Sequence, residues 1–283
     1  MSTPSYQKLA LIFASDYYGS NQLYGCINDA NDIKKFLLEK RGFTAGNITT
    51  VYDKQMTYNG MTKALATLVK QTEALAVKGV TPAVFLYYSG HGMRLAPARD
   101  ATEDKDGDEV LIPYDFTRGK FLLDDDLNKD FLKKLHPSTQ LFIFTDCCNS
   151  GTNFDLEYTD AQKQTGSGKI QAKVIHLSGS RDDQTSAEVG GHGIATARFL
   201  EVISPKVEDM DTFRAAMADV SIPAHLQNPQ VSTSDSALYD GKVFPWLVRD
   251  AKSKQYSAKE VRGATRKHLL KSVGALVKAF FSA

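Results

Sequence analysis

The stretch FLYYSGHG, residues 85–92, is a run of apolar, strand-forming side chains that stops abruptly at Ser-Gly-His-Gly. A second stretch, LFIFTDCCNSG, residues 141–151, has the same form, because an apolar run is again followed by reactive side chains. Short runs of this composition predict β-strands that are covered on both faces. In an open α/β sheet, functional groups gather beyond the carboxyl ends of the strands. We therefore expect His91 and the pair Cys147–Cys148 to meet at one edge of a sheet.

The same pattern recurs along the chain and predicts the fold class. Four short apolar segments are expected to be strands: residues 8–14, 83–89, 140–146 and 173–179. Amphipathic segments are expected to be helices: residues 28–40, 61–77, 125–135, 192–203 and 211–217. The polar stretches 94–108 and 157–169 are expected to be loops. This alternation predicts an α/β fold with a mostly parallel central β-sheet flanked by helices on both faces.

Composition limits the class of protein. The 283 residues fit one large domain with an appendage, and a hydrophobic content of 42% is ordinary for a globular protein with a core. No apolar stretch approaches the roughly 18 residues of a membrane span, and the first residues lack the features of a signal peptide. Three cysteines, two of them adjacent, make a poor disulfide framework. We therefore expect a reducing, cytoplasmic location.

The net charge of +1 hides a basic carboxyl-terminal segment, since residues 249–283 hold nine Lys or Arg and only two Asp or Glu. We expect one domain over residues 1–238 and a basic extension over residues 239–283. On a helix, the extension would carry apolar residues on one face and lysines on another: Leu269, Leu270, Val273, Leu276, Val277, Phe280 and Phe281, against Lys267, Lys271 and Lys278. Such a helix can pack on its own domain, dock a partner or lie on a membrane, and these alternatives stay open. We expect no nucleic-acid partner.

A thiol beside an imidazole is the requirement for nucleophilic catalysis, in which the thiolate attacks and the imidazole carries the proton. The chain between His91 and Cys148 is long enough for a loop and a crossover helix between neighbouring strands. Gly90 and Gly92 flank the histidine and let the backbone approach a ligand closely. The alternative is that these residues have only a structural role. A histidine at a strand end often only packs against its neighbours, and a reduced cysteine pair is often simply buried in the core. A metal site is disfavoured, since adjacent cysteines rarely bind one ion.

Six sequence blocks in one order resemble the metacaspases, which are caspase-like cysteine peptidases. The blocks run from Leu23 to about Asp235: LYGCINDA, YYSGHG, DGDEVLIPYD, TDCCNSG, LSGSRDDQTSAE and QNPQVSTSD. The resemblance implies a caspase-like fold and a catalytic pair of His91 and Cys148. It also implies oxyanion donors at the N–H groups of Gly92 and Cys148, a peptide substrate hydrolysed through a thioester, and a monomer. Asn149 departs from the pattern, because the family usually has His beside the nucleophile.

The resemblance also implies an S1 pocket, the pocket for the residue before the cleaved bond. Its members would be Cys26, Asp29, Ser89 and Asp146. Two carboxylates in one small pocket favour a cation, because an ion pair at 4 Å is worth roughly 4 kcal/mol at an effective dielectric near 20, before desolvation. We therefore expect Arg or Lys at P1. The alternatives are that Asp29 only caps a helix and that Asp146 only ends a strand.

The acidic clusters suggest calcium as an activator. By the same resemblance the ligands would be Asp108, Asp124, Asp125 and Asp155. Hard oxygen ligands in this number suit calcium. The alternative is a solvated loop around Asp108 and a helix start at Asp124–Asp125, where the helix dipole favours acidic residues.

Two further expectations concern activity. Lys163 and Lys169 lie in the expected loop 157–169 and are candidate self-cleavage sites for a peptidase specific for basic residues, although most loop lysines are only solvated. The alternative function is a non-proteolytic, caspase-like scaffold or aggregate-binding factor.

Overall fold

The computed structural model describes residues 6–19, 21–95, 108–147, 154–159, 162–163, 169–179, 188–189, 191–218 and 229–250; at 108, 162–163 and 188–189 it describes the backbone alone. The chain divides into two compact units, residues 1–251 and 252–283. Residues 239–250 of the expected basic extension belong to the first unit, and the rest of it lies outside the described residues, so the extension stays a prediction. No helix in the described part of the chain is long and apolar enough to cross a membrane.

The first unit is built on an eight-stranded sheet with the order β2-β1-β3-β7-β10-β13-β8-β9. The strands are β1 Tyr6–Ala14, β2 Ile48–Tyr52, β3 Thr81–Ser89, β7 Gln140–Asp146, β8 Tyr158–Thr159, β9 Gln162–Lys163, β10 Lys173–Ser178 and β13 Gln230–Thr233. The pairings among β2, β1, β3, β7 and β10 are parallel, and those of β13, β8 and β9 are antiparallel. The predicted α/β class and the mostly parallel sheet are confirmed.

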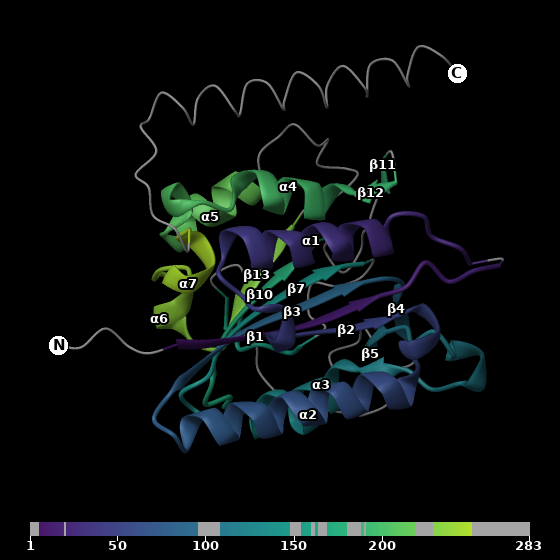
Figure 1. Ribbon diagram of the computed structural model, residues 1–283, viewed down its shortest axis with the longest axis horizontal. Helices are drawn as coiled ribbons and strands as arrows, with labels where there is room; N and C mark the ends of the chain where they lie inside the picture. Colours follow the sequence, from purple (N-terminus) through teal and green to yellow (C-terminus); the bar gives the residue numbers. More distant parts are fainter. Residues whose placement is uncertain are drawn as a thin grey trace, which may run out of the picture. The chain divides into compact units, whose positions relative to one another are not determined.

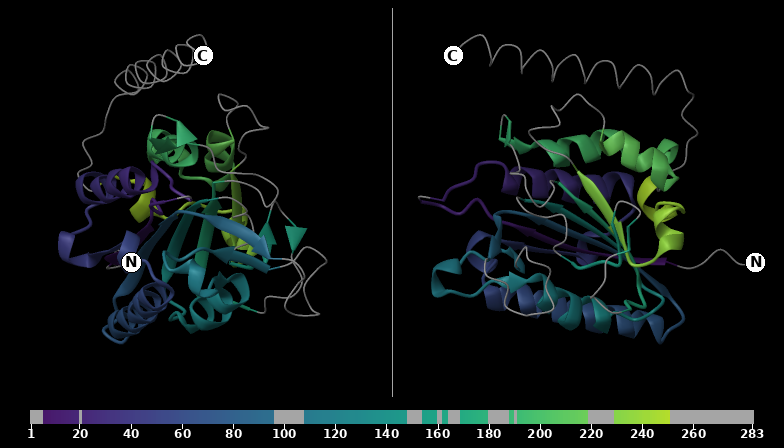
Figure 2. Two further views of the ribbon diagram at one scale, coloured as in Figure 1. Left: turned by 90° about the vertical axis from the view of Figure 1, so that its right-hand side faces the viewer. Right: turned by 180° about the vertical axis from the view of Figure 1, so that it is seen from behind.

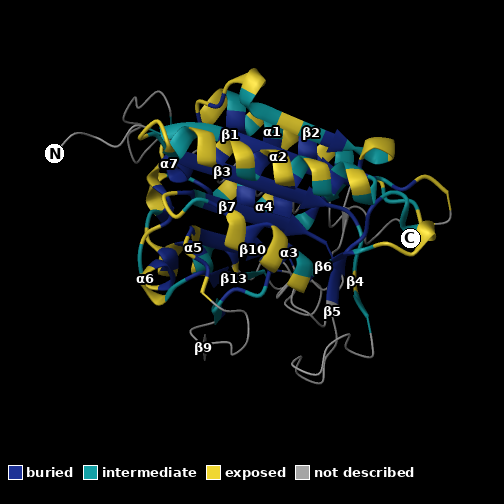
Figure 3. Ribbon diagram, turned by 90° about the horizontal axis from the view of Figure 1, so that it is seen from below, coloured by how far each residue is buried: buried dark blue, intermediate teal, exposed yellow. Residues whose placement is uncertain are grey.

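Helices cover both faces of this sheet (Figures 1 and 2). One face is covered by α1 Cys26–Lys40, α4 Ile194–Val202 and α5 Met210–Met217, and the other by α2 Tyr58–Ala76 and α3 Asp124–Asp130. Successive strand residues alternate between the two layers, so that Phe85 and Tyr87 share a cluster with Ile33, whereas Val84 and Leu86 pack on the other side. Figure 3 shows the buried strands beneath helices whose outer faces are exposed.

Smaller elements complete the unit. They are the sheet of β4 Gly92–Leu95, β5 Asp108–Leu111 and β6 Leu122–Leu123, the pair β11 Glu188–Val189 and β12 His192–Gly193, and the short helices α6 Ser236–Tyr239 and α7 Pro245–Val248. Five 3-10 turns occupy Ala45–Asn47, Asp53–Gln55, Phe116–Arg118, Leu132–Lys134 and Pro205–Val207. The helix expected over 192–203 begins only at Ile194, because residues 192–193 pair with β11. The helix expected over 125–135 ends at Asp130, and a tighter turn follows it.

The central strands end in register, and this positions the site. Ala14 at the end of β1 pairs with Ser89 at the end of β3, which pairs with Asp146 at the end of β7. Parallel strands deliver their carboxyl ends to the same edge of a sheet. Residues that follow these three positions therefore begin side by side, although they are far apart in the sequence.

His176 in β10 predicts how stability depends on pH. Its ring is buried, and Nε2 lies 2.8 Å from Thr145 Oγ1. Burial lowers the pKa of His176 from 6.5 to about 3. The unfolded chain therefore takes up a proton before the folded chain does as the pH falls below 6.5, and the free energy of unfolding drops by up to about 1.4 kcal/mol per pH unit until about pH 3. Urea unfolding at pH 7, 6, 5 and 4 measures this.

In the variant His176→Gln, which cannot take up the proton, we expect this part of the acid destabilisation to disappear. His136→Gln is the matched control, because His136 lies in an exposed turn, where its ring Nδ1 bonds to Ser138. An unchanged pH slope in His176→Gln would contradict the assignment.

Candidate active site

The predicted base, His91, lies two residues beyond the end of β3, and two buried tyrosine hydroxyls hold its peptide groups. Tyr17 Oη accepts the His91 N–H at 3.3 Å and donates to the Ile112 carbonyl. Tyr88 Oη donates to the His91 carbonyl at 2.6 Å and accepts the Ile112 N–H at 3.2 Å. Glycine is needed at position 90, because an added Cβ would lie 2.7 Å from Tyr17 Oη and 2.9 Å from Tyr88 Oη. The histidine backbone is therefore fixed on both sides.

The imidazole of His91 is oriented by the loop after β1. Its Nε2 lies 2.7 Å from the carbonyl oxygen of Asn21. A carbonyl can only accept, so Nε2 carries the proton of the neutral ring and Nδ1 is the nitrogen able to take another. The ring of Tyr17 packs against the imidazole, with centroids 4.6 Å apart and planes inclined by 44°. This arrangement leaves Nδ1 as the ring nitrogen that is available to a substrate or a nucleophile.

The predicted nucleophile, Cys148, lies outside the described residues, so the dyad with His91 stays a prediction. The register is informative, because position 148 follows β7 by two residues just as His91 follows β3, and the ends of these strands are paired. The neighbouring Cys147 is fully buried. Of the two predicted oxyanion donors, Gly92 begins β4 and pairs with Leu111, and the other is again Cys148. Both donor roles stay predictions.

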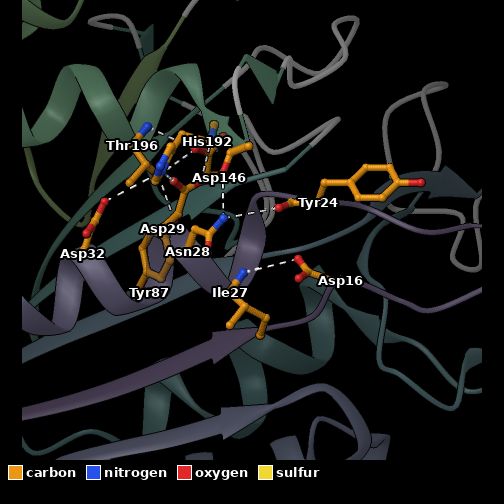
Figure 4. A network of polar contacts seen from close by, with 12 residues as sticks. Asp16, Tyr24, Ile27, Asn28, Asp29, Asp32, Tyr87, Asp146, His192 and Thr196 are labelled. Carbon is orange, nitrogen blue, oxygen red and sulfur yellow. Dashed lines mark hydrogen bonds and ion pairs between the residues drawn. The ribbon is translucent and has the colours of Figure 1, made fainter.

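Two predicted S1 residues, Asp29 and Asp146, come together at the amino end of α4 (Figure 4). Asp29 Oδ2 accepts the Gly193 N–H at 2.7 Å, and Asp29 Oδ1 lies 2.9 Å from His192 Nδ1. Asp146 Oδ2 accepts the N–H of Thr196 at 3.0 Å and its hydroxyl at 2.7 Å. A Cβ on Gly193 would lie 2.4 Å from Asp146 Oδ2 and 2.8 Å from Asp29 Oδ2. The two carboxylates therefore converge on one glycine.

The electrostatics of this pair follow from the donors around it. Asp29 is 2% exposed and Asp146 is 5% exposed, so each ionised carboxylate needs donors to offset its lost hydration. The first N–H groups of a helix have no partner within the helix, and the helix dipole favours anions there. These amides and the Thr196 hydroxyl are neutral donors, and the His192 ring lies beside Asp29 as a group that can carry positive charge. Burial, and then the charges of Asp146 and Asp29, raises the pKa of Tyr87 well above its usual value.

The other predicted pocket residues lie on α1, which carries Asp29, and on β3, which pairs with the strand of Asp146. Cys26 is the first residue of α1 and Ser89 the last residue of β3, and both are buried. The alternative in which Asp29 only caps α1 does not describe it, because the cap residue is Gly25 and the Asp29 carboxylate bonds across to β12. Asp146 does end a strand, but its side chain also binds the start of α4.

Sequence reasoning missed five residues of this region. They are Tyr17, Asn21, His192, Gly193 and Thr196. One signal was present, since Gly191-His192-Gly193 repeats the Gly-His-Gly of residues 90–92. His192 Nδ1 lies 2.9 Å from Asp29 Oδ1 and 3.7 Å from Asp32 Oδ2, so it is a neighbour of one of the predicted S1 residues. No signal pointed to Asn21, because its contribution is a main-chain carbonyl.

The residues predicted to bind calcium are only partly brought together. Asp124 is buried at the start of α3, where Oδ2 accepts the Glu109 N–H and Oδ1 accepts the Asp125 N–H, both at 2.9 Å. Asp125 is exposed, and of Asp108 only the backbone is described. Within the described residues, no three Asp, Glu, His or Cys side chains are gathered as a metal site would need. The calcium site stays a prediction.

A buried amide links the helix of Asp124 to the segment of Asp155. Asn128 Nδ2 donates to the carbonyls of Phe154 at 3.0 Å and Asp155 at 3.1 Å. Asp155 adopts φ 44, a backbone conformation that is unusual for a residue with a side chain. Asn128 Oδ1 is buried and has no hydrogen-bond partner among the residues that the structure describes. This donor set of carboxylates and an unbonded amide oxygen is chemically suited to a hard cation.

The remaining predicted positions are not tested. Lys163 lies in β9, where only the backbone is described, and Lys169 is exposed. The expected loop 157–169 contains the two short strands β8 and β9. The amphipathic face expected near the carboxyl terminus lies outside the described residues.

Comparison with known proteins gives consistent matches. Residues 8–157 match a family model described as "Metacaspase, peptidase C14 domain". Metacaspase-1 of Candida albicans is 32% identical over 301 residues, covering 82% of this chain and 66% of that protein. Metacaspase-1 of Kluyveromyces lactis is 29% identical over 300 residues, covering 81% and 66%. Metacaspase-4 of Arabidopsis thaliana is 27% identical over 273 residues, covering 85% and 60%. The chain thus spans slightly less than two thirds of the length of these relatives.

Solved structures agree on the fold. A crystal structure of a Geobacter sulfurreducens protein matches with a TM-score of 0.63 at 24% identity, covering 86% of this chain and 99% of that one. Caspase-1 from Spodoptera frugiperda matches with a TM-score of 0.50 at 11% identity, covering 88% and 93%. The caspase-like fold predicted from the sequence is confirmed.

Proposed function

Because this chain belongs to the metacaspase family of C14 peptidases, we propose that it is a cysteine endopeptidase that cleaves after Arg or Lys. The observation that carries the specificity is the convergence of two buried carboxylates, Asp29 and Asp146, on Gly193. A guanidinium or ammonium group is the side chain that this negative pocket favours. An Asp side chain at P1 would meet like charges and is expected to be excluded.

In the proposed reaction, His91 Nδ1 takes the proton of the Cys148 thiol, and the thiolate attacks the carbonyl carbon after the basic residue. The N–H groups of Gly92 and Cys148 would stabilise the oxyanion. The imidazolium then returns its proton to the leaving amine, and a thioester remains. Water, deprotonated by the same imidazole, hydrolyses the thioester and releases the new carboxyl terminus. The Nε2 contact with Asn21 supports this assignment, because it leaves Nδ1 unprotonated.

The experiment is cleavage of matched fluorogenic peptides that differ only at P1, as Arg, Lys, Gln or Asp, with and without calcium. We expect turnover of the Arg and Lys peptides and none of the Asp peptide. We also expect no turnover in Cys148→Ala, while Cys147→Ala keeps activity. A preference for Asp would contradict the pocket. Absence of turnover for every peptide in both conditions, or full activity in Cys148→Ala, would contradict the peptidase itself.

We further propose that calcium binds at Asp124, Asp125, Asp155 and Asp108, with Asn128 joining α3 to the segment of Asp155. Calcium would neutralise these carboxylates and draw them together. Asp155 follows Cys148 by seven positions, so an ion held there would restrain the segment that carries the nucleophile. This coupling is how binding would stimulate cleavage.

Calcium is therefore expected to stabilise the fold as well as activity. At about a hundred times its Kd, a ligand that binds only the folded chain raises the free energy of unfolding by about 2.7 kcal/mol. Urea unfolding with calcium and with a chelator measures this difference within each variant. We expect Asp124→Asn to abolish the difference and the control Asp130→Asn, which changes a surface residue of the same helix, to keep it. No difference in the wild type would contradict the site.

A further inference from the structure

Tyr17 combines three features that do not fit an ordinary core aromatic. It is 2% exposed, its backbone has φ 43, and its ring and hydroxyl both contact the predicted base. A bulky side chain with positive φ is an outlier, because Cβ then crowds the preceding peptide group. Such conformations persist only when their surroundings enforce them, and they cluster at functional sites. The loop after β1 must therefore hold Tyr17 in place.

The surrounding loop does enforce this conformation. Ser15 Oγ accepts the Tyr17 N–H at 3.2 Å and donates to Asp53 Oδ1 at 3.3 Å. The same Asp53 oxygen accepts the Asp16 N–H at 3.0 Å, and the Asp16 carbonyl accepts the Leu23 N–H at 2.6 Å. Tyr17 is thus held by hydrogen bonds of the residues just before it, to Asp53 on one side and to Leu23, which precedes α1, on the other.

In its strained conformation, Tyr17 makes two contacts with His91. The ring of Tyr17 packs on the His91 imidazole at 4.6 Å between centroids, and its hydroxyl accepts the His91 N–H at 3.3 Å. Asn21, four residues further along the same loop, supplies the carbonyl that binds Nε2 at 2.7 Å. The His91 main chain, the plane of its ring and its tautomer are therefore set by contacts with Tyr17 and Asn21. An unstrained residue at position 17 would not direct its side chain along this path.

We propose that Tyr17 is a positioning residue for His91: its strained backbone places its ring and hydroxyl against the histidine and so holds the imidazole in the tautomer with Nδ1 unprotonated. This inference rests on the proposed function, in which His91 is the base. Its effect is on the rate of the chemical step. Substrate binding, which depends on the carboxylates near Gly193, should be unaffected.

Two substitutions separate the contributions of Tyr17. Tyr17→Phe keeps the ring and removes only the hydroxyl, so we expect kcat to fall about 3- to 10-fold. Tyr17→Leu removes the ring as well, so we expect kcat to fall about 100-fold, with KM within about twofold of the wild type in both variants. Tyr18→Phe and Tyr18→Leu are the matched controls, because Tyr18 is the next residue and is 64% exposed. Thermal unfolding identifies any variant that fails to fold.

A spectroscopic test does not depend on peptidase activity. Nitrogen-15 NMR of the imidazole rings, with the His91 signals assigned by their absence in His91→Gln, reports which nitrogen carries the proton. We expect the Nε2–H tautomer in the wild type and in Tyr17→Phe, and a mixture of tautomers in Tyr17→Leu. Wild-type tautomer together with wild-type kcat in a folded Tyr17→Leu would overturn the proposal, and so would a loss that appears only in KM. If no peptide is cleaved by any form, the tautomer result still decides the role of Tyr17.

Discussion

Replacing His91 by alanine should lower kcat/KM for an Arg-terminated peptide by about 10³-fold or more. Losing one member of a nucleophile–base pair typically costs 10³- to 10⁶-fold, and what remains comes from binding and oxyanion stabilisation. The geometry supports a large value, because His91 is held at its backbone by two tyrosine hydroxyls and at Nε2 by a carbonyl. Steady-state cleavage of the fluorogenic peptide at pH 7.5 measures the change.

A second measurement separates the role of the imidazole from general damage. If His91 takes the thiol proton, alkylation of Cys148 by iodoacetamide at neutral pH should be slower in His91→Ala, as read by mass spectrometry of the peptide that contains Cys148. His136→Ala is the control, because His136 lies in a turn beyond the opposite end of the strands, just before β7. Wild-type turnover and alkylation in His91→Ala would refute the assignment of the base.

Replacing Asp146 by asparagine should lower kcat/KM by about 10²- to 10³-fold for Arg and Lys peptides. The substitution keeps the shape of the side chain and removes one of two buried charges that would face the P1 cation. Removing one partner of a buried charge pair typically costs 2–5 kcal/mol. Because each 1.4 kcal/mol is a factor of ten, the middle of that range, about 2.8–4.2 kcal/mol, gives the expected loss.

The design of this test uses the neutral Gln peptide. We expect Asp146→Asn to lose selectivity for Arg over Gln, because an amide discriminates less between a charged and a neutral side chain. Asp211→Asn is the control for loss of a single negative charge, since Asp211 is 87% exposed and pairs with Arg214 on the surface. An unchanged Arg-to-Gln ratio in Asp146→Asn would show that another group recognises the P1 residue.

Much of the fold could be predicted because the central strands are long and apolar. The segments expected at 83–89 and 140–146 are observed as Thr81–Ser89 and Gln140–Asp146, and the resemblance to the metacaspases is confirmed. The short strands were missed, among them Ile48–Tyr52 and Gln230–Thr233, because four or five residues carry too little periodicity to separate a strand from a loop. Their strand character comes from pairing with neighbours that are distant in the sequence.

The site could be predicted only where the residue type and its place in a motif indicate a chemical role. His91 follows a strand, and Asp29 and Asp146 were assigned by the family resemblance. The contact between α1 and β12 was not predictable, because it joins Asp29 to Gly193 across 164 positions of the chain. Composition and motif spacing could not predict the strained backbone of Tyr17 or the carbonyl contact of Asn21, since both are properties of the main chain.

The row formed by Ala14, Ser89 and Asp146 is set by main-chain pairing between parallel strands, which is nearly indifferent to the identity of the side chains. Reactivity and selectivity can consequently be altered independently of each other. Under the proposed S1 assignment, exchanges at 29, 146 or 192 are expected to change the preferred P1 residue while the spacing between the strand ends stays as it is. The sheet is in this sense a scaffold on which new substrate specificities could be engineered.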